Sequence, residues 1–448
     1  MKRVLWVCNI MLPAIAQELH LPYSNREGWL SGIFRQLTEG PGENTAEVSL
    51  KGEREICLGV CFPVTDRSQI PASEKAGGFR VKGVPCYAFL EDLGHPERYD
   101  ASLEERFREI FADFKPDILH IFGTEFPHAL AAVRSFNRPE RTLIGIQGLC
   151  GEIARAYMAG LPEKVQHQVT FRDLVRRDSI RQQQKKFLQR GEQETLAIKG
   201  CGNITGRTRF DREGTARLNP DAEYFHMNET MRKEFYTGSW KLENCEEHSI
   251  FLGQGDYPLK GMHFVLEAMA RLSESYPDVK LYVAGNSIIN DRTFKEKLKL
   301  PAYGKYLLSL IKKYGLEKKV IMTGKLTAEE MKQQFLRSHV FVCASVLENS
   351  PNTVGEAMLL GVPVAASEAG GIPDMITDGQ DGLLFETGNA DSLAKAIGKL
   401  FDRTVDEIGL CPAQRLSAQA AQRARSVHDG AANYHRLLEI YDRIGEKA

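Results

Sequence analysis

The stretch from Ala344 to Ser367, ASVLENSPNTVGEAMLLGVPVAAS, has the residue types of an anion site at the start of a helix. An apolar strand ends near the start of this stretch. A polar loop then leads to Ser350, a good N-cap, and Pro351, which suits the first helical position. The backbone amides of Asn352 and Thr353 would be unpaired at that helix start. Unpaired amides at the positive end of a helix dipole stabilise phosphate, so we expect a diphosphate to bind here.

Two carboxylates frame this expected helix start. Glu348 lies in the loop before the helix, and Glu356 lies inside it. Carboxylate oxygens accept hydrogen bonds from hydroxyls, so Glu356 can hold both hydroxyls of a ribose and Glu348 can contact a transferred sugar. A solvated pair of surface glutamates is the alternative interpretation. The flanking strand and loop favour the phosphate site, because such a site requires them.

The same residues carry a resemblance to a known family. Glu348 and Glu356 form the Glu-x7-Glu signature, followed by EAMLLGVPVAAS and then by EAGGIPDMITDGQDGLLF with Gly370 and Gly371. In these motifs the chain resembles the retaining glycosyltransferases of family 4, which have the GT-B fold. The resemblance implies transfer of a sugar from a nucleotide diphosphate donor to a hydroxyl acceptor.

A second motif, SIFLGQGDYPLKGMHFVLEAM, matches the family with one departure. In the family, a strand ending in glycine is followed by an arginine, a lysine-glycine pair opens the next helix, and both cations hold the donor's phosphates. This chain has Lys260-Gly261, but Gln254 stands where the arginine is usual. The resemblance therefore implies that Lys260 neutralises the leaving diphosphate, while Gln254 hydrogen-bonds a phosphate oxygen without adding charge. A solvated lysine at a helix start is the alternative.

The first half resembles the family's acceptor domain more loosely. Gly28 opens the first long helix and occupies the place of the family's glycine-rich loop beside the donor. The family often has a second histidine two positions after His120, where this chain has Phe122, so His120 is either a buried strand residue or a ligand. We expect Glu125 and His128, in the turn that follows, to face the cleft, with Glu125 in a catalytic role.

No two aspartates have the D-x-D spacing that commonly binds a divalent ion in sugar transfer. A lysine and helix-terminal amides can stabilise a diphosphate instead, so we predict metal-independent chemistry without a cofactor. The resemblance implies that the sugar keeps its anomeric configuration through front-side attack, with the departing phosphate taking the acceptor's proton. No carboxylate is placed as a covalent nucleophile, so Glu348 is assigned to positioning and electrostatic support.

Short apolar strands alternate with helices through both halves of the chain, which predicts parallel sheets covered on both faces. VLWVCNIM, EICLGVCF, DILHIFG and TLIGIQG are strands expected in the first half, and SIFLGQG, VKLYVAGN, KVIMTGK, HVFVCAS and VPVAAS in the second. We predict an α/β fold of two Rossmann-like doubly wound domains that face each other across a cleft, the GT-B arrangement. The expected parts are an acceptor domain (1–225), a linker (226–248), a donor domain (249–415) and a terminal helix (416–448) that packs back toward the N-terminal domain.

Composition limits the choice of partners and compartment. The 58 basic and 59 acidic residues leave a formal charge of -1, so nothing draws the whole molecule to nucleic acid. Nine cysteines without a C-x-x-C pair suit a reducing compartment, so we expect a cytoplasmic protein. The apolar run after Lys2 and Arg3 fits either a signal peptide or a buried first strand, and its short length and strand-forming residues favour the strand.

The segment FRDLVRRDSIRQQQKKFLQR, residues 171–190, is an expected basic helix. It fits either a membrane-contacting helix or a solvated helix face, and its thin apolar side favours the solvated face. HIFGTEFPH and ITGRTRFD resemble bacterial members of the family that build surface polysaccharides. The expected partners are therefore a nucleotide-sugar donor and a carbohydrate or lipid-linked saccharide acceptor, with peripheral contact at the inner membrane face.

Two other functions stay open. One is a different GT-B chemistry, such as a nucleotide-sugar epimerase or a glycogen-type phosphorylase or synthase. The other is a non-catalytic nucleotide-sugar-binding subunit, which the departures at Gln254 and Phe122 keep in view. An NAD-binding oxidoreductase is disfavoured because no G-x-G-x-x-G opens the first helix.

Overall fold

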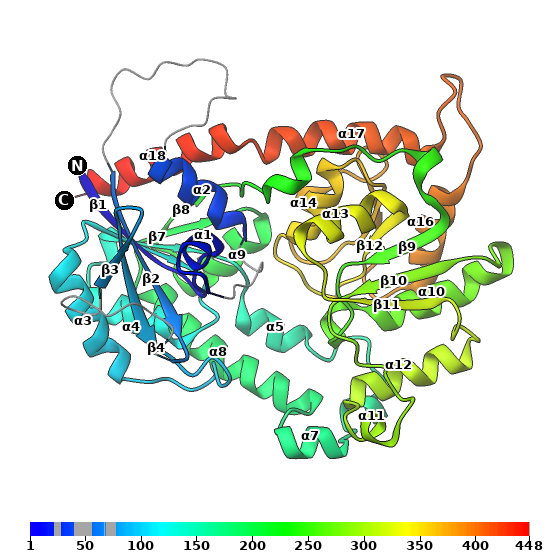
Figure 1. Cartoon of the computed structure of the whole chain (residues 1–448), viewed down its shortest axis with the longest axis horizontal. Coiled ribbons are helices and arrows are strands. Elements are labelled where there is room, and N and C mark those ends of the chain that lie inside the picture. Colours follow the sequence, from blue (N-terminus) through cyan, green and yellow to red (C-terminus); the bar gives the residue numbers. More distant parts are fainter. Residues whose placement is uncertain (22–27, 40–55, 67, 69–77, 448) are drawn as a thin grey trace. The chain divides into compact units, whose positions relative to one another are not determined.

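A computed structural model describes the chain except for residues 22–27, 40–55, 67, 69–77 and 448 (Figure 1). The chain divides into two compact units. Unit 1 contains residues 1–152, 186–232 and 428–448, and unit 2 contains residues 153–185 and 233–427. This division differs from the expected boundaries in three places: residues 153–185 join unit 2, the expected linker 226–248 is divided between the units after residue 232, and unit 2 extends to residue 427.

Unit 1 is built on an eight-stranded sheet in the order β3-β4-β2-β1-β5-β6-β7-β8. All neighbouring strands are parallel except β3, which runs antiparallel to β4. The strands are β1 (Lys2–Val7), β2 (Ile56–Val64), β3 (Gly78–Val81), β4 (Val84–Leu90), β5 (Ile118–Phe122), β6 (Thr142–Gly145), β7 (Asn203–Gly206) and β8 (Glu223–His226). The apolar run at the start of the chain is therefore a central strand, as its strand-forming residues predict.

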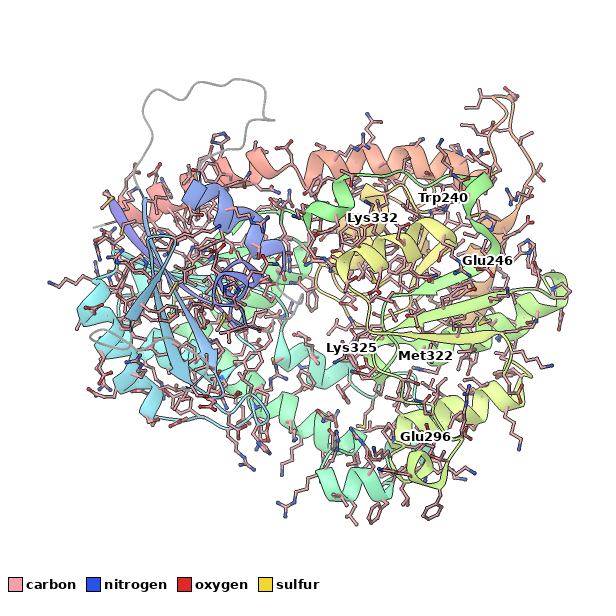
Figure 2. The ribbon with its side chains drawn as sticks, in the orientation of Figure 1. Trp240, Glu246, Glu296, Met322, Lys325 and Lys332 are labelled. Atoms are coloured by element: carbon pink, nitrogen blue, oxygen red, sulfur yellow. The ribbon has the colours of Figure 1, made fainter. Side chains whose placement is uncertain are left out.

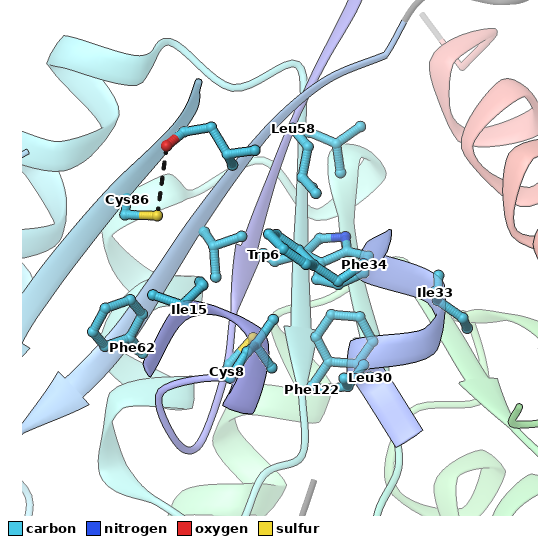
Figure 3. Packing of buried hydrophobic residues seen from close by; sticks show 14 of the residues in the cluster. Trp6, Cys8, Ile15, Leu30, Ile33, Phe34, Leu58, Phe62, Cys86 and Phe122 are labelled. Atoms are coloured by element: carbon cyan, nitrogen blue, oxygen red, sulfur yellow. Dashed lines mark hydrogen bonds between the residues drawn. The ribbon is translucent and has the colours of Figure 1, made fainter. Parts of the chain in front are cut away.

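Alternation along β1 divides the core of unit 1 into two clusters. Val4 and Trp6 point to one face of the sheet, and Leu5 and Val7 point to the other. Figure 3 shows Trp6 on the first face beside Phe34 of α2 and Phe122 of β5. The helices of this unit are α1 (Pro13–Glu18), α2 (Gly28–Glu39), α3 (Ser102–Phe114), α4 (Pro127–Phe136), α5 (Cys150–Ala156), α8 (Ile180–Lys199), α9 (Arg209–Leu218) and α18 (Gly430–Gly445), with α5 and α8 each continuing into unit 2.

Unit 2 is built on a fully parallel sheet in the order β11-β10-β9-β12-β13-β14. Its strands are β9 (Glu246–Leu252), β10 (Lys280–Ala284), β11 (Val320–Gly324), β12 (Ser338–Cys343), β13 (Val364–Ser367) and β14 (Leu383–Phe385). The strand order reverses between β9 and β12, and ligands of open α/β sheets bind beyond the carboxyl ends of the strands at such a reversal. The expected strands of the second half are all present.

The helices of unit 2 cover both faces of this sheet, and they include a short one, α7, from the 153–185 segment. They are α6 (Glu163–Gln166), α7 (Phe171–Arg176), α10 (Met262–Ser275), α11 (Phe294–Leu298), α12 (Ala302–Lys313), α13 (Ala328–Arg337), α14 (Asn352–Leu359), α15 (Ile372–Met375), α16 (Ala390–Phe401) and α17 (Pro412–Val427). In the part of the chain that the structure describes, no helix is long and apolar enough to cross a bilayer.

Polar contacts hold the N-terminal end of β9, the first strand of unit 2. Glu246 at the start of β9, labelled in Figure 2, accepts hydrogen bonds from three side chains. The donors are Lys280 at 2.7 Å, Tyr282 at 2.7 Å and Arg337 at 2.8 Å. Burial alone would raise the pKa of Glu246, but these three donors outweigh it and lower the pKa to about 2. The carboxylate is therefore charged at neutral pH and ties β9, β10 and α13 together.

The C-terminal segment is not one helix, as the sequence suggested, but two. Asp429 is the N-cap of α18, and its side chain accepts a hydrogen bond from the amide of Ala432 at 2.7 Å. This cap separates α17, which packs on α14 in unit 2, from α18, which packs on unit 1.

Candidate functional site

The two residues expected to act on the leaving group and the sugar meet in unit 2. Lys260 follows β9 and Glu348 follows β12, the two strands at the reversal of the sheet order. The Lys260 ammonium lies 2.5 Å from Glu348 Oε1, and Ser345 Oγ donates to the same oxygen at 2.6 Å. The backbone also joins the two loops, because the amide of Val346 donates to the carbonyl of Leu259 at 2.9 Å.

Burial and charge act in opposite directions on Lys260. Burial on its own lowers the pKa of the ammonium, but the Glu348 carboxylate beside it outweighs burial, and the net pKa is raised. The side chains of Lys260 and Glu348 are only 21% and 14% exposed. The interpretation of these residues as a solvated lysine and a solvated surface glutamate therefore does not describe the structure.

Glycines let the backbone approach both members of this pair. Gly261 has φ +69° and lies so close that a Cβ would collide with the carbonyl oxygen of Ala344, at the end of β12. Gly370 has φ +55°, and a Cβ there would collide with the carbonyl oxygen of Glu348. A residue with a side chain would be strained at either position and would also displace these loops.

Helix α14 begins one residue later than expected. Its first residue is Asn352 and its N-cap is Pro351, whose ring offers no acceptor for the amides of the first turn. Ser350 is therefore not the N-cap; its hydroxyl lies 3.5 Å from the sulfur of Met375. The side-chain oxygen of Asn352 is buried and has no hydrogen-bond partner among the described residues. The start of α14 thus retains polar groups that a ligand can use.

Glu356 lies inside α14, eight positions after Glu348 in the sequence, and is only 2% exposed. Thr353 lies in the first turn of the same helix, and its methyl group lies close to Gly253 at the end of β9. The predicted donor residues of the loop before α14 and of α14 itself thus lie on one strand–loop–helix segment, whose Glu348 contacts Lys260.

Gln254 points toward the loop after β10. Its amide donates to Asp256 Oδ1 at 2.9 Å, and Asn286 donates to Asp256 Oδ2 at 3.0 Å. Tyr257 follows Asp256 in the chain, and its ring centre lies 5.6 Å from the Lys260 ammonium. Sequence reasoning did not select Ser345, Asp256 or Tyr257. Their place in the two loops that follow β9 and β12 was the available signal.

A pocket of about 500 Å³ opens beside Tyr257 within unit 2. This volume is within the usual range for small-molecule sites. Its walls come from the loops after β9 and β10, from the region between α11 and α12, and from the 153–185 segment. Asp256, Tyr257, Asn286, Tyr303, Arg172 and Arg176 are among the lining residues.

The candidate residues of unit 1 form a separate group. Gly28 begins α2, as the sequence predicts, and its neighbours 22–27 lie outside the described residues. Glu125 is partly buried just before α4 and accepts a hydrogen bond from Asn9 at 3.2 Å; burial raises the pKa of its carboxyl group.

His128 is wholly buried, with one ring nitrogen 2.7 Å from Glu91 and the other 3.1 Å from Asn9. It lies in the interior of unit 1 and not on a ligand-facing surface, so the expectation for His128 was wrong.

His120 and Phe122 are core residues of β5. His120 Nδ1 lies 2.7 Å from the hydroxyl of Tyr441, and burial lowers the pKa of His120 to about 3. The Phe122 ring packs edge-on against Trp6, with centroids 4.9 Å apart. Phenylalanine at this position thus completes the apolar packing around Trp6.

These two parallel α/β units give the chain the GT-B fold. Sucrose-phosphate synthase from Thermosynechococcus elongatus superposes with a TM-score of 0.64 at 16% identity, covering 99% of each chain. HepE from Anabaena, solved in complex with UDP-glucose, superposes with a TM-score of 0.62 at 14% identity, covering 99% of this chain and all of HepE. At such identities the likeness concerns the fold.

Sequence comparison finds a family match for the second half of the chain. Residues 234–423 match the family model described as glycosyl transferases group 1, so this part of the chain is similar to the domain of that family. A putative glycosyltransferase of Bacillus subtilis, YtcC, is 30% identical over 164 residues, which cover 36% of this chain and 38% of YtcC. The sulfoquinovosyl transferase SQD2 of Arabidopsis thaliana is 31% identical over 152 residues, 33% of this chain and 26% of SQD2. The aligned segments span between about a quarter and just under a half of the curated relatives' length.

Proposed function

We propose that the protein is a retaining glycosyltransferase of family 4 that moves a sugar from a nucleotide diphosphate donor to a hydroxyl acceptor in bacterial polysaccharide or glycoconjugate synthesis. The observation that carries this proposal is the Lys260–Glu348 pair at the sheet reversal of a domain similar to the group 1 glycosyl transferases. The pair joins a cation suited to a leaving diphosphate with a carboxylate suited to sugar hydroxyls.

In the proposed reaction the bond between the anomeric carbon and the donor phosphate oxygen breaks. The acceptor oxygen bonds to the same face of that carbon, and the acceptor proton passes to the departing phosphate. Lys260 stays protonated at neutral pH because its pKa is raised, so it stabilises the negative charge that develops on the phosphate. Glu348 holds the sugar in position, and Glu125, a residue of unit 1, keeps its proposed catalytic role.

The donor binds through the start of α14 in this proposal. The first-turn amides of Asn352 and Thr353 meet the diphosphate, with Ser350 and Gln254 as further polar contacts, and Glu356 holds the ribose. HepE was solved with UDP-glucose, which supports a nucleotide diphosphate sugar as the donor class. Thermal stabilisation by UDP-, GDP- and ADP-sugars in turn will identify the base, because a bound donor raises the melting temperature by mass action.

We propose metal-independent transfer, with Lys260 and the α14 amides in place of a divalent ion. Activity should therefore be unchanged by EDTA, and loss of activity that Mg²⁺ or Mn²⁺ restores would contradict this part of the proposal. We also propose a cytoplasmic protein whose acceptor is a carbohydrate or a lipid-linked saccharide at the inner membrane face.

Single substitutions at the ion pair test the site. Lys260→Ala and Glu348→Ala should each lower transfer at least about a hundredfold, the usual size of a lost transition-state contact, with folding intact. Arg403 and Glu247 form an exposed ion pair 3.0 Å apart in the same unit, and alanine at either position should leave transfer unchanged. Near-normal transfer by both site variants would refute the assignment.

A non-catalytic nucleotide-sugar-binding subunit is the second candidate. Gln254 supports it, because this side chain brings no charge to the expected phosphate position and donates to Asp256. Donor binding without turnover on any acceptor would favour this function. Conversion of the donor without an acceptor would instead favour a nucleotide-sugar epimerase.

A further inference from the structure

Helix α7 turns its apolar side outward. Phe171, Leu174 and Val175 lie on one face at helical spacing and are 62%, 69% and 67% exposed, and Val169 just before the helix is 55% exposed. The helix of a globular protein ordinarily buries its apolar face. The sequence favoured a solvated polar face for this segment; the structure shows that its outer surface is apolar.

The polar side of α7 is fixed inward. Arg172 bridges Asp173 at 3.1 Å and Asp178 at 2.9 Å, and Arg172 and Arg176 line the 500 Å³ pocket of unit 2. Asp173 is buried, closes a capping box with Thr170, and accepts a hydrogen bond from the amide of Ala302 at 2.9 Å. These contacts fix which face of α7 is outward, so a simple rotation cannot bury the apolar side chains.

Helix α11 adds a second exposed apolar strip in the same region. Phe294 and Leu298, one turn apart, are 78% and 40% exposed. The two helices are neighbours, because Lys299 at the end of α11 lines the same pocket as Arg176 of α7. Figure 1 shows α7 and α11 at the same end of unit 2, and Figure 2 labels Glu296 on α11.

The exposed charges around these side chains are mostly basic. In residues 169–181 and 291–299 the exposed basic residues are Arg177, Arg181, Arg292, Lys295 and Lys297, together with Arg176 and Lys299, which also line the pocket. The exposed acidic residue is Asp291. The other carboxylates are engaged within the protein: Asp173 and Asp178 with Arg172, and Glu296 with the amide of Thr293 at 2.8 Å.

We propose that this surface, the α7–α11 patch (residues 169–181 and 291–299), docks on an anionic lipid bilayer. Exposed phenylalanine and leucine surrounded by arginine and lysine are the composition of an interfacial anchor: the apolar groups enter the headgroup layer and the cations attract anionic lipids. A second copy of the chain fits less well, because a symmetric contact of the patch with itself would oppose its basic residues. Membrane docking goes beyond sugar transfer and assigns a partner to residues that the proposed reaction does not use.

Co-sedimentation of the full chain with vesicles tests the proposal. Vesicles of phosphatidylcholine with phosphatidylglycerol should bind the protein, and vesicles of phosphatidylcholine alone should bind it at least about tenfold more weakly. The triple variant Phe171→Ser, Leu174→Ser, Val175→Ser and the double variant Arg177→Glu, Lys297→Glu should each lose at least about tenfold in affinity. Ile408→Ser is the matched control, since Ile408 is an exposed apolar residue of unit 2 outside the patch, 75% exposed, and its loss should not change binding.

Three results would overturn the proposal. They are equal binding to neutral and anionic vesicles, unchanged binding by the patch variants, and a dimer in solution that the triple variant abolishes without any vesicle binding. Vesicle binding by Lys260→Ala at the wild-type level would separate docking from transfer, so a failure of the proposed function would leave this inference intact. Circular dichroism of each variant confirms that the fold is retained.

Discussion

The carbonyl oxygen of Glu348 accepts a hydrogen bond of 3.0 Å from the amide of Gly371, and Gly370 lies directly against that carbonyl. The GG pair of the EAGGIP motif therefore supports the loop that carries Glu348. Because the support is a backbone contact, it does not depend on the ion pair with Lys260.

The first prediction concerns this support. Gly370→Ala should lower transfer at least about tenfold, because the new Cβ would collide with the Glu348 carbonyl and move the carboxylate. Gly379→Ala is the control: Gly379 has a similar positive φ of +71°, but no described atom lies within 4 Å of its Cβ position. Both variants should lose about 1 kcal/mol of stability from the backbone strain. Equal activity of the two variants would show that the collision does not matter.

The second prediction places at position 254 the arginine that is usual in the family which the chain resembles. Gln254→Arg should lower the donor KM by up to about tenfold, because a guanidinium adds a charge-assisted hydrogen bond to the diphosphate. Gln254→Leu should raise the KM, and Gln333→Arg, an exposed position on α13, should leave it unchanged. A donor KM that rises in Gln254→Arg would show that Gln254 does not face the phosphates. Steady-state kinetics over a range of donor concentrations measures all three.

The sequence predicted the elements around the site because their signals are local. The β9 and β12 strands are short apolar runs, and the glutamates and the lysine-glycine pair lie at the strand–loop–helix positions that a phosphate site requires. The meeting of Lys260 with Glu348 also follows from a local rule, since both loops leave the carboxyl ends of neighbouring parallel strands.

Other features depended on long-range packing and could not be read from the sequence. His128 was expected to face a ligand, but Glu91, 37 positions earlier, and Asn9 hold it in the core. The α7 segment has a helical pattern with both apolar and basic residues, and contacts such as that of Asp173 with the amide of Ala302, 129 positions later, decide which face is outward. The single-residue error at the start of α14 is of the size expected for helix ends.

The third prediction concerns the hydroxyl of Tyr441 on α18. It accepts a hydrogen bond from the indole of Trp6 at 2.7 Å and lies 2.7 Å from His120 Nδ1, so the C-terminal helix is bonded to β1 and β5. Tyr441→Phe would leave both buried partners unsatisfied, and we expect a loss of at least about 2 kcal/mol in the free energy of unfolding of unit 1. Tyr306→Phe, at a partly exposed tyrosine of unit 2, should cost less than about 0.5 kcal/mol. Urea unfolding followed by tryptophan fluorescence gives both values, and a similar cost at both positions would contradict the bonding role of Tyr441.

The fourth prediction is a pH effect at Glu194 on α8. This carboxyl group is 2% exposed, and burial raises its pKa to about 7, against the hydrogen bonds it accepts from Thr124 at 2.8 Å and from the amides of Cys150 at 3.0 Å and Gly151 at 3.1 Å. Between pH 4.5 and about pH 7 the folded state therefore holds a proton on Glu194 that the unfolded state has lost. The reason is that the unfolded state has the ordinary glutamate pKa of 4.5. The stability that this proton gives is present below pH 4.5 and is lost as the pH rises through 7, about 3 kcal/mol in all.

Glu194→Gln removes this titration, since an amide has no proton to lose in this range. The free energy of unfolding of the variant relative to wild type should therefore rise by about 3 kcal/mol between pH 4 and pH 8, whatever the pH-independent cost of the amide's different hydrogen bonds. Glu192→Gln, two residues earlier on the same helix and exposed, should show no such slope. Urea unfolding of the three proteins at four or more pH values measures the slopes. A flat difference between Glu194→Gln and wild type would mean that the Glu194 carboxyl group is charged throughout this range in the folded state, stabilised by its three donors despite its burial.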